Sequence, residues 1–247
     1  MSYTSYFYLL FFLGVLVALY YLMPLKKRWL VLLGGSYFFY WLASGKLIVF
    51  LLITTVSVYL GALAMEREQQ AFDSVRKSLE KEERKARKAV MMRRKRHIVF
   101  AMVLINVGFL AFLKYYHFFS ANINALGSHL EPGFQLPALK LLMPLGISFY
   151  TLSAVGYVID VYRETTKAQK NYAKVLLYIS FFPQLIAGPI VKYHDVEQEI
   201  EHRTQSADGV ARGIRRFIAG LSKKVLISNV MGMTADAVFG AAAGTLG

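Results

Sequence analysis

The stretch from Leu141 to Ile190 constrains this chain most, because it contains two apolar runs that are each interrupted by proline and glycine. The interrupting residues are Pro144, Gly146, Pro183, Gly188 and Pro189. Lipid cannot hydrogen-bond free backbone groups, so non-helical backbone at membrane depth is tolerated only where it is buried in protein or lines a water-filled cavity. We therefore predict that these backbone breaks line a functional cavity inside a membrane protein.

The composition supports a membrane-embedded chain. Of its 247 residues, 56% are hydrophobic and 15% are aromatic, which is unusual for a soluble domain. Several apolar runs approach the roughly 20 residues that a membrane-spanning helix requires. We predict an all-α, polytopic membrane protein whose residues 1–247 form a single membrane domain. The absence of cysteine excludes disulfides, thiolate nucleophiles and cysteine-based metal sites.

The order of the apolar runs predicts membrane spans and one re-entrant segment. The spans are residues 6–23, 29–43, 47–65, 98–113 and 141–162, and the re-entrant segment is 172–190. The basic triplet Lys26–Arg28 places the first loop in the cytoplasm and therefore the N-terminus outside. No cleavage site follows the first run, so we expect a retained span and not a signal peptide. Residues 120–140 predict an external loop with room for one short interfacial helix, and residues 214–226 predict an amphipathic helix at the cytoplasmic face that can turn into a further span after Val225.

A charged segment separates the third and fourth spans. Residues 66–97 contain 12 lysines and arginines against 6 acidic residues, and pairs such as Glu80 with Arg84 have the spacing that supports an exposed helix. We predict a cytoplasmic helical loop. The cluster Arg93–Arg96 either binds lipid headgroups or a partner, or only anchors the topology, and the positive-inside rule favours the anchor. The lipid bilayer accounts for the net charge of +14, and we predict no nucleic-acid partner.

Six polar residues in or beside the interrupted runs are candidates for lining a passage for substrate or acyl groups. They are Ser148, Tyr150, Ser153, Asp160, Gln184 and His194. An ionisable group such as Asp160 inside an apolar run marks a functional site by default, although an ion pair with Arg163 one turn away is the alternative. The hydroxyls can instead bond neighbouring helices, and the Gln184 amide can instead satisfy backbone groups that the prolines leave free.

The histidines do not predict a metal site, because none of His97, His117, His129, His194 and His202 has a partner at ligand spacing. We expect His97, His129 and His202 to be solvated and His117 to belong to an interfacial aromatic belt. His194, just past the second interruption, is the one considered for a direct role. The chain has no phosphate-binding loop and no evident nucleophile–base pair. These residues alone therefore predict a broken-helix cavity but no particular reaction.

Four motifs occur in an order that resembles one family. The motifs are FLKYYHFF, MPLGISFYTLSAVGYVIDVYR, FFPQLIAGPIVKY and GIRRFIAGLSKKVLISN, within a resemblance that covers about residues 29–239. They resemble the bacterial branch of the membrane-bound O-acyltransferases, whose members acetylate alginate or transfer D-alanine to lipoteichoic acid. Ser153 stands where many relatives have glutamine, and His117 stands where asparagine is common.

The resemblance implies a partial helical ring with a tunnel through a thinned membrane centre. An acyl group, expected to be acetyl, passes from a cytoplasmic donor, acyl-CoA or an acyl-carrier protein, to hydroxyls of an exported polysaccharide or to a partner transferase. No bound cofactor is implied. The family's catalytic histidine lies in a later tryptophan–histidine region, whereas the only tryptophans here are Trp29 and Trp41. We therefore expect an N-terminal portion with no catalytic residue of its own, inactive by itself.

Three other functions stay open. D-alanyl transfer to teichoic acid is the alternative within the family. Transporters and flippases also build midplane sites from broken helices, although no inverted repeat is evident in the sequence. A non-catalytic membrane scaffold is the third alternative, because the expected catalytic histidine is missing from these residues.

Overall fold

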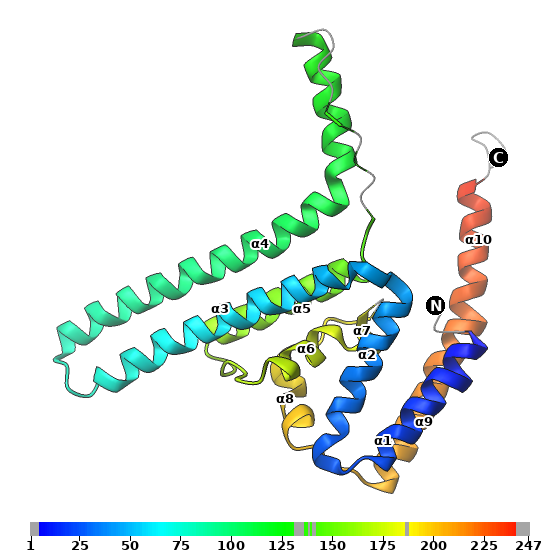
Figure 1. Ribbon diagram of the computed structural model, residues 1–247, viewed down its shortest axis with the longest axis horizontal. Coiled ribbons are helices and arrows are strands. Elements are labelled where there is room, and N and C mark those ends of the chain that lie inside the picture. Colours follow the sequence, from blue (N-terminus) through cyan, green and yellow to red (C-terminus); the bar gives the residue numbers. More distant parts are fainter. Residues whose placement is uncertain (1–4, 131–135, 138, 140–141, 186–187, 241–247) are drawn as a thin grey trace. The chain divides into compact units, whose positions relative to one another are not determined.

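The computed structural model describes residues 5–130, 136–137, 139, 142–185 and 188–240. Every regular element in these residues is helical (Figure 1), which confirms the predicted all-α class. Two helical stretches, residues 25–75 and 81–127, are long and apolar enough to cross a membrane. Leu141 and residues 186–187 of the interrupted stretch, together with most of residues 131–140, lie outside the described residues.

The chain divides into two compact units, one of which combines both ends of the sequence. Its helices are η1 (Phe7–Phe12), the first part of α1 (Leu13–Leu22), α9 (Ala207–Ser222), η4 (Lys223–Ser228) and α10 (Asn229–Gly240). Helical structure is continuous from α9 to α10, so the predicted amphipathic helix lies within this run. The Ser206 hydroxyl caps its start by accepting a hydrogen bond of 3.1 Å from the Gly209 N–H. The single membrane domain over residues 1–247 stays a prediction.

The other unit, residues 19–201, holds the interrupted stretch. Its helices are η2 (Leu25–Lys27), α2 (Arg28–Ser44), η3 (Gly45–Leu47), α3 (Ile48–Val75), α4 (Lys81–Leu130), α5 (Ile147–Tyr162), α6 (Tyr172–Ser180), α7 (Phe182–Leu185) and α8 (Tyr193–Glu201). Helix α3 packs against α4, α5 and α6, and α2 packs against α6 and α7 (Figure 1). The buried core therefore lies among these helices and surrounds the interrupted stretch.

Small and polar side chains join α3 to α4. A Cβ atom on Gly61 of α3 would lie 2.7 Å from Met102 Cγ on α4, so the two helices approach each other closely there. The Asn106 amide donates a hydrogen bond of 3.1 Å to the Ser57 hydroxyl and one of 2.8 Å to the Met102 carbonyl. Because polar groups in apolar surroundings must be paired, these bonds hold α4 against α3.

Helix α4 differs from the prediction, because one helix of 50 residues runs from Lys81 to Leu130. It joins part of the charged segment, the predicted fourth span and the first half of the predicted external loop. No proline interrupts this range, and the next one, Pro132, follows the helix end. Residues 120–130 are therefore the end of α4 and not a separate short helix within a loop, since nothing in the sequence stops the helix earlier.

The charged segment 66–97 forms a helical hairpin, made by the end of α3 and the start of α4. That this segment is a cytoplasmic loop stays a prediction. The ion pairs within its described residues are Arg76–Asp73 and Arg94–Glu68, each at 3.3 Å. The expected pair of Glu80 with Arg84 is not among them. Arg76–Asp73 lies along the end of α3, and Arg94–Glu68 joins α4 to α3.

Candidate functional site

The two predicted backbone interruptions meet in the structure. Gly146, which precedes α5, has a φ of 68°, in the left-handed region that glycine adopts most easily. A Cβ atom at this position would lie 2.0 Å from the carbonyl oxygen of Leu185 in α7. The first interruption therefore lies directly against the second, and only glycine fits at the contact.

The second interruption begins earlier than the sequence indicated. Helix α6 ends at Ser180, and Phe181 has a non-helical ψ of 109° before the single turn of α7. Pro183 lies in this turn, where its missing N–H is tolerated, and Gly188 beyond it has a φ of 140°. The predicted break near the far end of 172–190 is therefore accompanied by one near its middle.

Helix α2 satisfies backbone groups in both interruptions. The Ser44 hydroxyl accepts a hydrogen bond of 3.1 Å from the Leu145 N–H. The Ser36 hydroxyl accepts one of 3.3 Å from the Phe182 N–H and donates one of 2.7 Å to the Leu32 carbonyl. An amide left unpaired in such a buried place costs about 1–3 kcal/mol. These two serines explain how the chain keeps non-helical backbone here.

Neither Ser36 nor Ser44 was predicted from the sequence as a site residue. The signal was present, because Ser36 and Ser44 are hydroxyl residues in the otherwise apolar run 29–44. Hydroxyls in such a run bond either their own helix or a neighbour, and the sequence does not distinguish the two. Only the packing of α2 against α6 and α7 assigns them to the interruptions.

Three of the predicted passage residues keep polar atoms without protein partners. Ser148 and Ser153 of α5 and Gln184 of α7 are half-buried, and their side chains make no hydrogen bond to other described residues. Their polar atoms are available to water or to a ligand. Their role in lining a passage stays a prediction.

Two buried tyrosines place further hydroxyls in this region. Tyr150 of α5 is 1% exposed and Tyr40 of α2 is 0% exposed. Their hydroxyls interact with each other, but within the described residues neither has the geometry of a hydrogen bond. A buried hydroxyl without a hydrogen bond is unfavourable, so a polar partner for either hydroxyl would stabilise it. Tyr150 was predicted from the sequence as a passage residue, and Tyr40 was not.

Asp160, near the end of α5, and His194, in α8, lie close together, although 33 residues separate them in the sequence. His194 Nδ1 is 3.5 Å from Asp160 Oδ2, and His194 Nε2 is 3.1 Å from Asp195 Oδ1. The Asp160 side chain is 12% exposed, so water does little to stabilise its charge. Among the described residues, His194 and not Arg163 is the ionic neighbour of Asp160. The His194 imidazole therefore lies between the carboxylates of Asp160 and Asp195.

A polar network fixes α8, which carries His194, against the loop that follows α5. The Gln169 side-chain amide donates a hydrogen bond of 3.0 Å to the Tyr193 hydroxyl, and the Gln169 backbone N–H donates one of 2.8 Å to the Tyr157 hydroxyl. Burial raises the pKa of Tyr193 to about 12, so this hydroxyl stays protonated at neutral pH. The rings of Tyr157 and Tyr193 also meet edge to face at 5.0 Å. His194 is therefore held in place by groups that the sequence did not single out.

Residues 167–240 match the membrane-bound O-acyltransferase family. This range contains α6, α7 and α8, and therefore the second interruption and His194. The match confirms the resemblance that the motifs predicted. This match and the two long apolar helices are consistent with the predicted all-α membrane class.

Three curated relatives show which members of this family the chain is similar to. The chain is 35% identical to the probable alginate O-acetylase AlgI of Azotobacter vinelandii over 56% of this chain and 27% of that protein. It is 31% identical to the peptidoglycan O-acetyltransferase of Helicobacter pylori over 54% of this chain and 30% of that protein. It is 30% identical to the teichoic acid D-alanyltransferase of Bacillus subtilis over 40% of this chain and 26% of that protein.

The similarity covers only part of each relative. The chain spans between 26% and 30% of the length of these three curated proteins. No solved structure matches the chain. The comparisons therefore concern one portion of an acyltransferase and not its complete active site.

Proposed function

We propose that this chain is part of a membrane-bound O-acyltransferase that transfers an acyl group, expected to be acetyl, to hydroxyls of an exported cell-surface polysaccharide. The family match and the relatives named for O-acetylation of alginate and of peptidoglycan support this function. The observation that carries it is the contact of Gly146 with Leu185, because the matched segment and the first interruption meet there. Transfer of an acyl group within the membrane requires a place where donor and acceptor can meet, and the two interruptions together provide one.

The helix lengths support a passage at this contact. Helix α5 has 16 residues and α6 has 9, which at 1.5 Å per residue are about 24 Å and 13 Å long. Both are shorter than the hydrocarbon core of about 30 Å. A helix that ends inside the membrane shortens the distance between donor and acceptor, so neither has to cross the whole bilayer.

We also propose the orientation of the chain. The basic excess in residues 66–97 supports a cytoplasmic hairpin and an external N-terminus. The donor, acyl-CoA or an acyl-carrier protein, then approaches from the side of the hairpin. The acceptor polymer, or a partner transferase, approaches from the opposite side. The Asp160–His194 pair belongs to the donor side in this arrangement, because α5 ends there.

The chemistry requires a base that takes the proton from the acceptor hydroxyl and donors that stabilise the carbonyl oxygen. We assign no catalytic base to this chain and expect it from another part of the enzyme. The hydroxyls of Tyr40 and Tyr150 are suited to hold a polar group of the substrate beside the interruptions. Tyr150→Phe in the complete enzyme should therefore lower transfer while the ring preserves packing.

The test is incorporation of label by membrane vesicles that contain the complete enzyme. We expect labelled acetyl groups to appear in the polysaccharide and the amount to fall in Tyr150→Phe. Incorporation of labelled D-alanine instead would select the alternative that the Bacillus subtilis relative favours. Movement of donor across the membrane without any covalent label in polymer would refute acyl transfer and support a transporter.

A further inference from the structure

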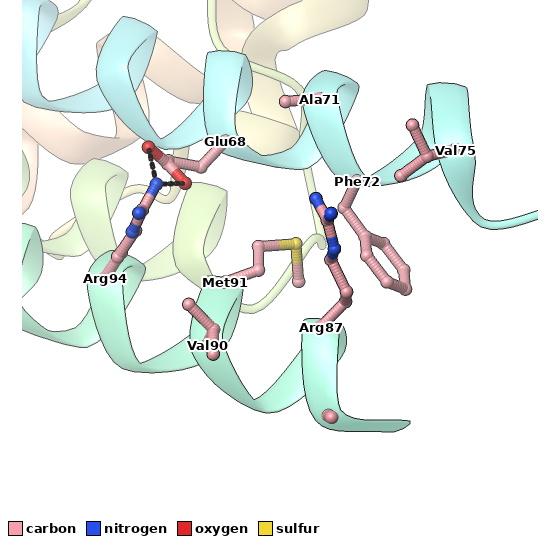
Figure 2. Close-up of a pocket in the computed structure, with 9 residues that line it drawn as sticks. Glu68, Ala71, Phe72, Val75, Arg87, Val90, Met91 and Arg94 are labelled. Atoms are coloured by element: carbon pink, nitrogen blue, oxygen red, sulfur yellow. Dashed lines mark hydrogen bonds and ion pairs between the residues drawn. The ribbon is translucent and has the colours of Figure 1, made fainter. Parts of the chain in front are cut away.

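The α3–α4 hairpin carries a pocket outside the site described above (Figure 2). Its volume is about 400 Å³, and it lies between the end of α3 and the start of α4. The apolar residues that line it are Ala71, Phe72, Val75, Ala86, Val90 and Met91. Phe72 is 8% exposed and Met91 is 4% exposed, whereas Val90 is 54% exposed. The pocket therefore has a packed apolar floor with an accessible edge.

Two arginines flank this floor. Arg87 and Arg94 are seven residues apart on α4, so they share one face of the helix and lie about 10 Å apart along its axis. Arg94 pairs with Glu68, but the two side chains are 65% and 30% exposed, so this pair is weak. Arg87 makes no ion pair or hydrogen bond with a residue in the described part of the chain, and Figure 2 shows it beside Phe72.

The part of the hairpin farthest from Ile98 lies beyond the reach of the bilayer surface. Helix α4 continues from the hairpin into its apolar span, which begins at Ile98. At 1.5 Å per residue, Arg87 lies about 16 Å beyond that point and Lys81 about 25 Å beyond it. The headgroup layer occupies about 6 Å, and attraction to its charges is screened over about 8 Å. Headgroups therefore reach the Arg93–Arg96 cluster but not Arg87.

We propose that this pocket is a docking surface for an acidic, amphipathic helix of a water-soluble partner protein. Carboxylates seven residues apart on such a helix match Arg87 and Arg94, and apolar side chains between them cover Val90 and Met91. The excess of 12 basic over 6 acidic residues in the segment 66–97 attracts an acidic partner and repels a basic one. A second copy of this chain, with a net charge of +14, does not fit this surface. The surface is separate from the acyl passage and does not depend on the function proposed above.

The test uses the full chain in phosphatidylcholine nanodiscs and a fluorescent helical peptide. The peptide has glutamates at positions i and i+7 and leucines at i+3 and i+4. We expect saturable binding by fluorescence anisotropy, weakened about tenfold or more by Arg87→Glu. Lys88→Glu is the matched control, because it makes the same charge change on a different face of α4 and should alter the affinity less than about threefold.

Four results would overturn the proposal. The first is an absence of binding to the wild-type chain. The second is an equal loss in Arg87→Glu and Lys88→Glu, which would show unspecific attraction. The third is undiminished binding of a peptide whose leucines are replaced by serine. The fourth is loss of peptide binding when phosphatidylglycerol enters the nanodisc, because lipid then occupies the surface. Circular dichroism confirms that each variant compared is folded.

Discussion

Gly146→Ala tests the contact between the two interruptions. The left-handed backbone at this position, with a φ of 68°, disfavours alanine by about 1–2 kcal/mol. The new Cβ atom would lie 2.0 Å from the Leu185 carbonyl oxygen and 3.1 Å from Leu185 Cγ. The first of these neighbours is backbone and cannot rotate away, and overpacking of this kind costs about 1–3 kcal/mol. The expected destabilisation is therefore about 2–5 kcal/mol.

The assay is thermal unfolding of the purified chain in detergent, followed by tryptophan fluorescence. For a chain of this size, each kcal/mol lowers the Tm by about 2–4 °C, so we expect Gly146→Ala to unfold about 4–20 °C below wild type. Gly156→Ala is the matched control, because it makes the same change within α5 and its Cβ atom would meet nothing within 4 Å. Helix propensity predicts that this control is stabilised by up to about 1 kcal/mol. Equal Tm values for the two variants would refute the contact.

Two further predictions use the same assay. Ser36→Ala removes the hydroxyl that accepts a hydrogen bond from the buried Phe182 N–H and should lower the stability by about 1–3 kcal/mol, whereas Ser74→Ala on the exposed part of α3 should change it by less than about 0.5 kcal/mol. Glu164→Gln should destabilise the chain more than Lys95→Met. The first change removes the negative charge beside an ammonium group that is 1% exposed and leaves it the hydrogen bond to the Gln69 side chain, whereas the second leaves a carboxylate that is 50% exposed.

Each of these two predictions has a result that would contradict it. A loss in Ser36→Ala no larger than in Ser74→Ala would mean that the Phe182 amide is satisfied in another way. A larger loss in Lys95→Met than in Glu164→Gln would mean that the lysine stem packs the hairpin against α5 and that its charge contributes little. Each comparison holds the size of the side chain nearly constant or uses an exposed site of the same type.

The positions where helices end could be predicted from the sequence. Proline and glycine act on the backbone locally, so Pro144 with Gly146 and Pro183 marked the interruptions before any contact was known. Proline also explains where α4 ends. The stretch after Ser120 contains no proline before Pro132, so it continues α4 and does not start a separate helix.

The partners of these positions could not be predicted. The Ser36 hydroxyl accepts a hydrogen bond from the Phe182 amide, 146 residues further along the chain. A hydroxyl in an apolar helix can bond its own helix or any neighbouring one, so the sequence does not identify its partner. Asp160 had an arginine one turn away in the sequence, yet the structure places His194 beside it. Both assignments depend on how distant helices pack, and that information is spread over the whole core.

The most direct test of the central claim is the accessibility of single cysteines to water, which the cysteine-free chain permits without prior substitutions. Ser153→Cys and Gln184→Cys place thiols at predicted passage positions. The control is Leu152→Cys, because Leu152 is next to Ser153 and its side chain is 45% exposed on the outside of α5. If the interruptions enclose a water-filled passage, a charged, membrane-impermeant methanethiosulfonate reagent labels the first two variants in lipid vesicles and leaves Leu152→Cys unlabelled. Labelling of neither passage position, or equal labelling of all three, would contradict the account.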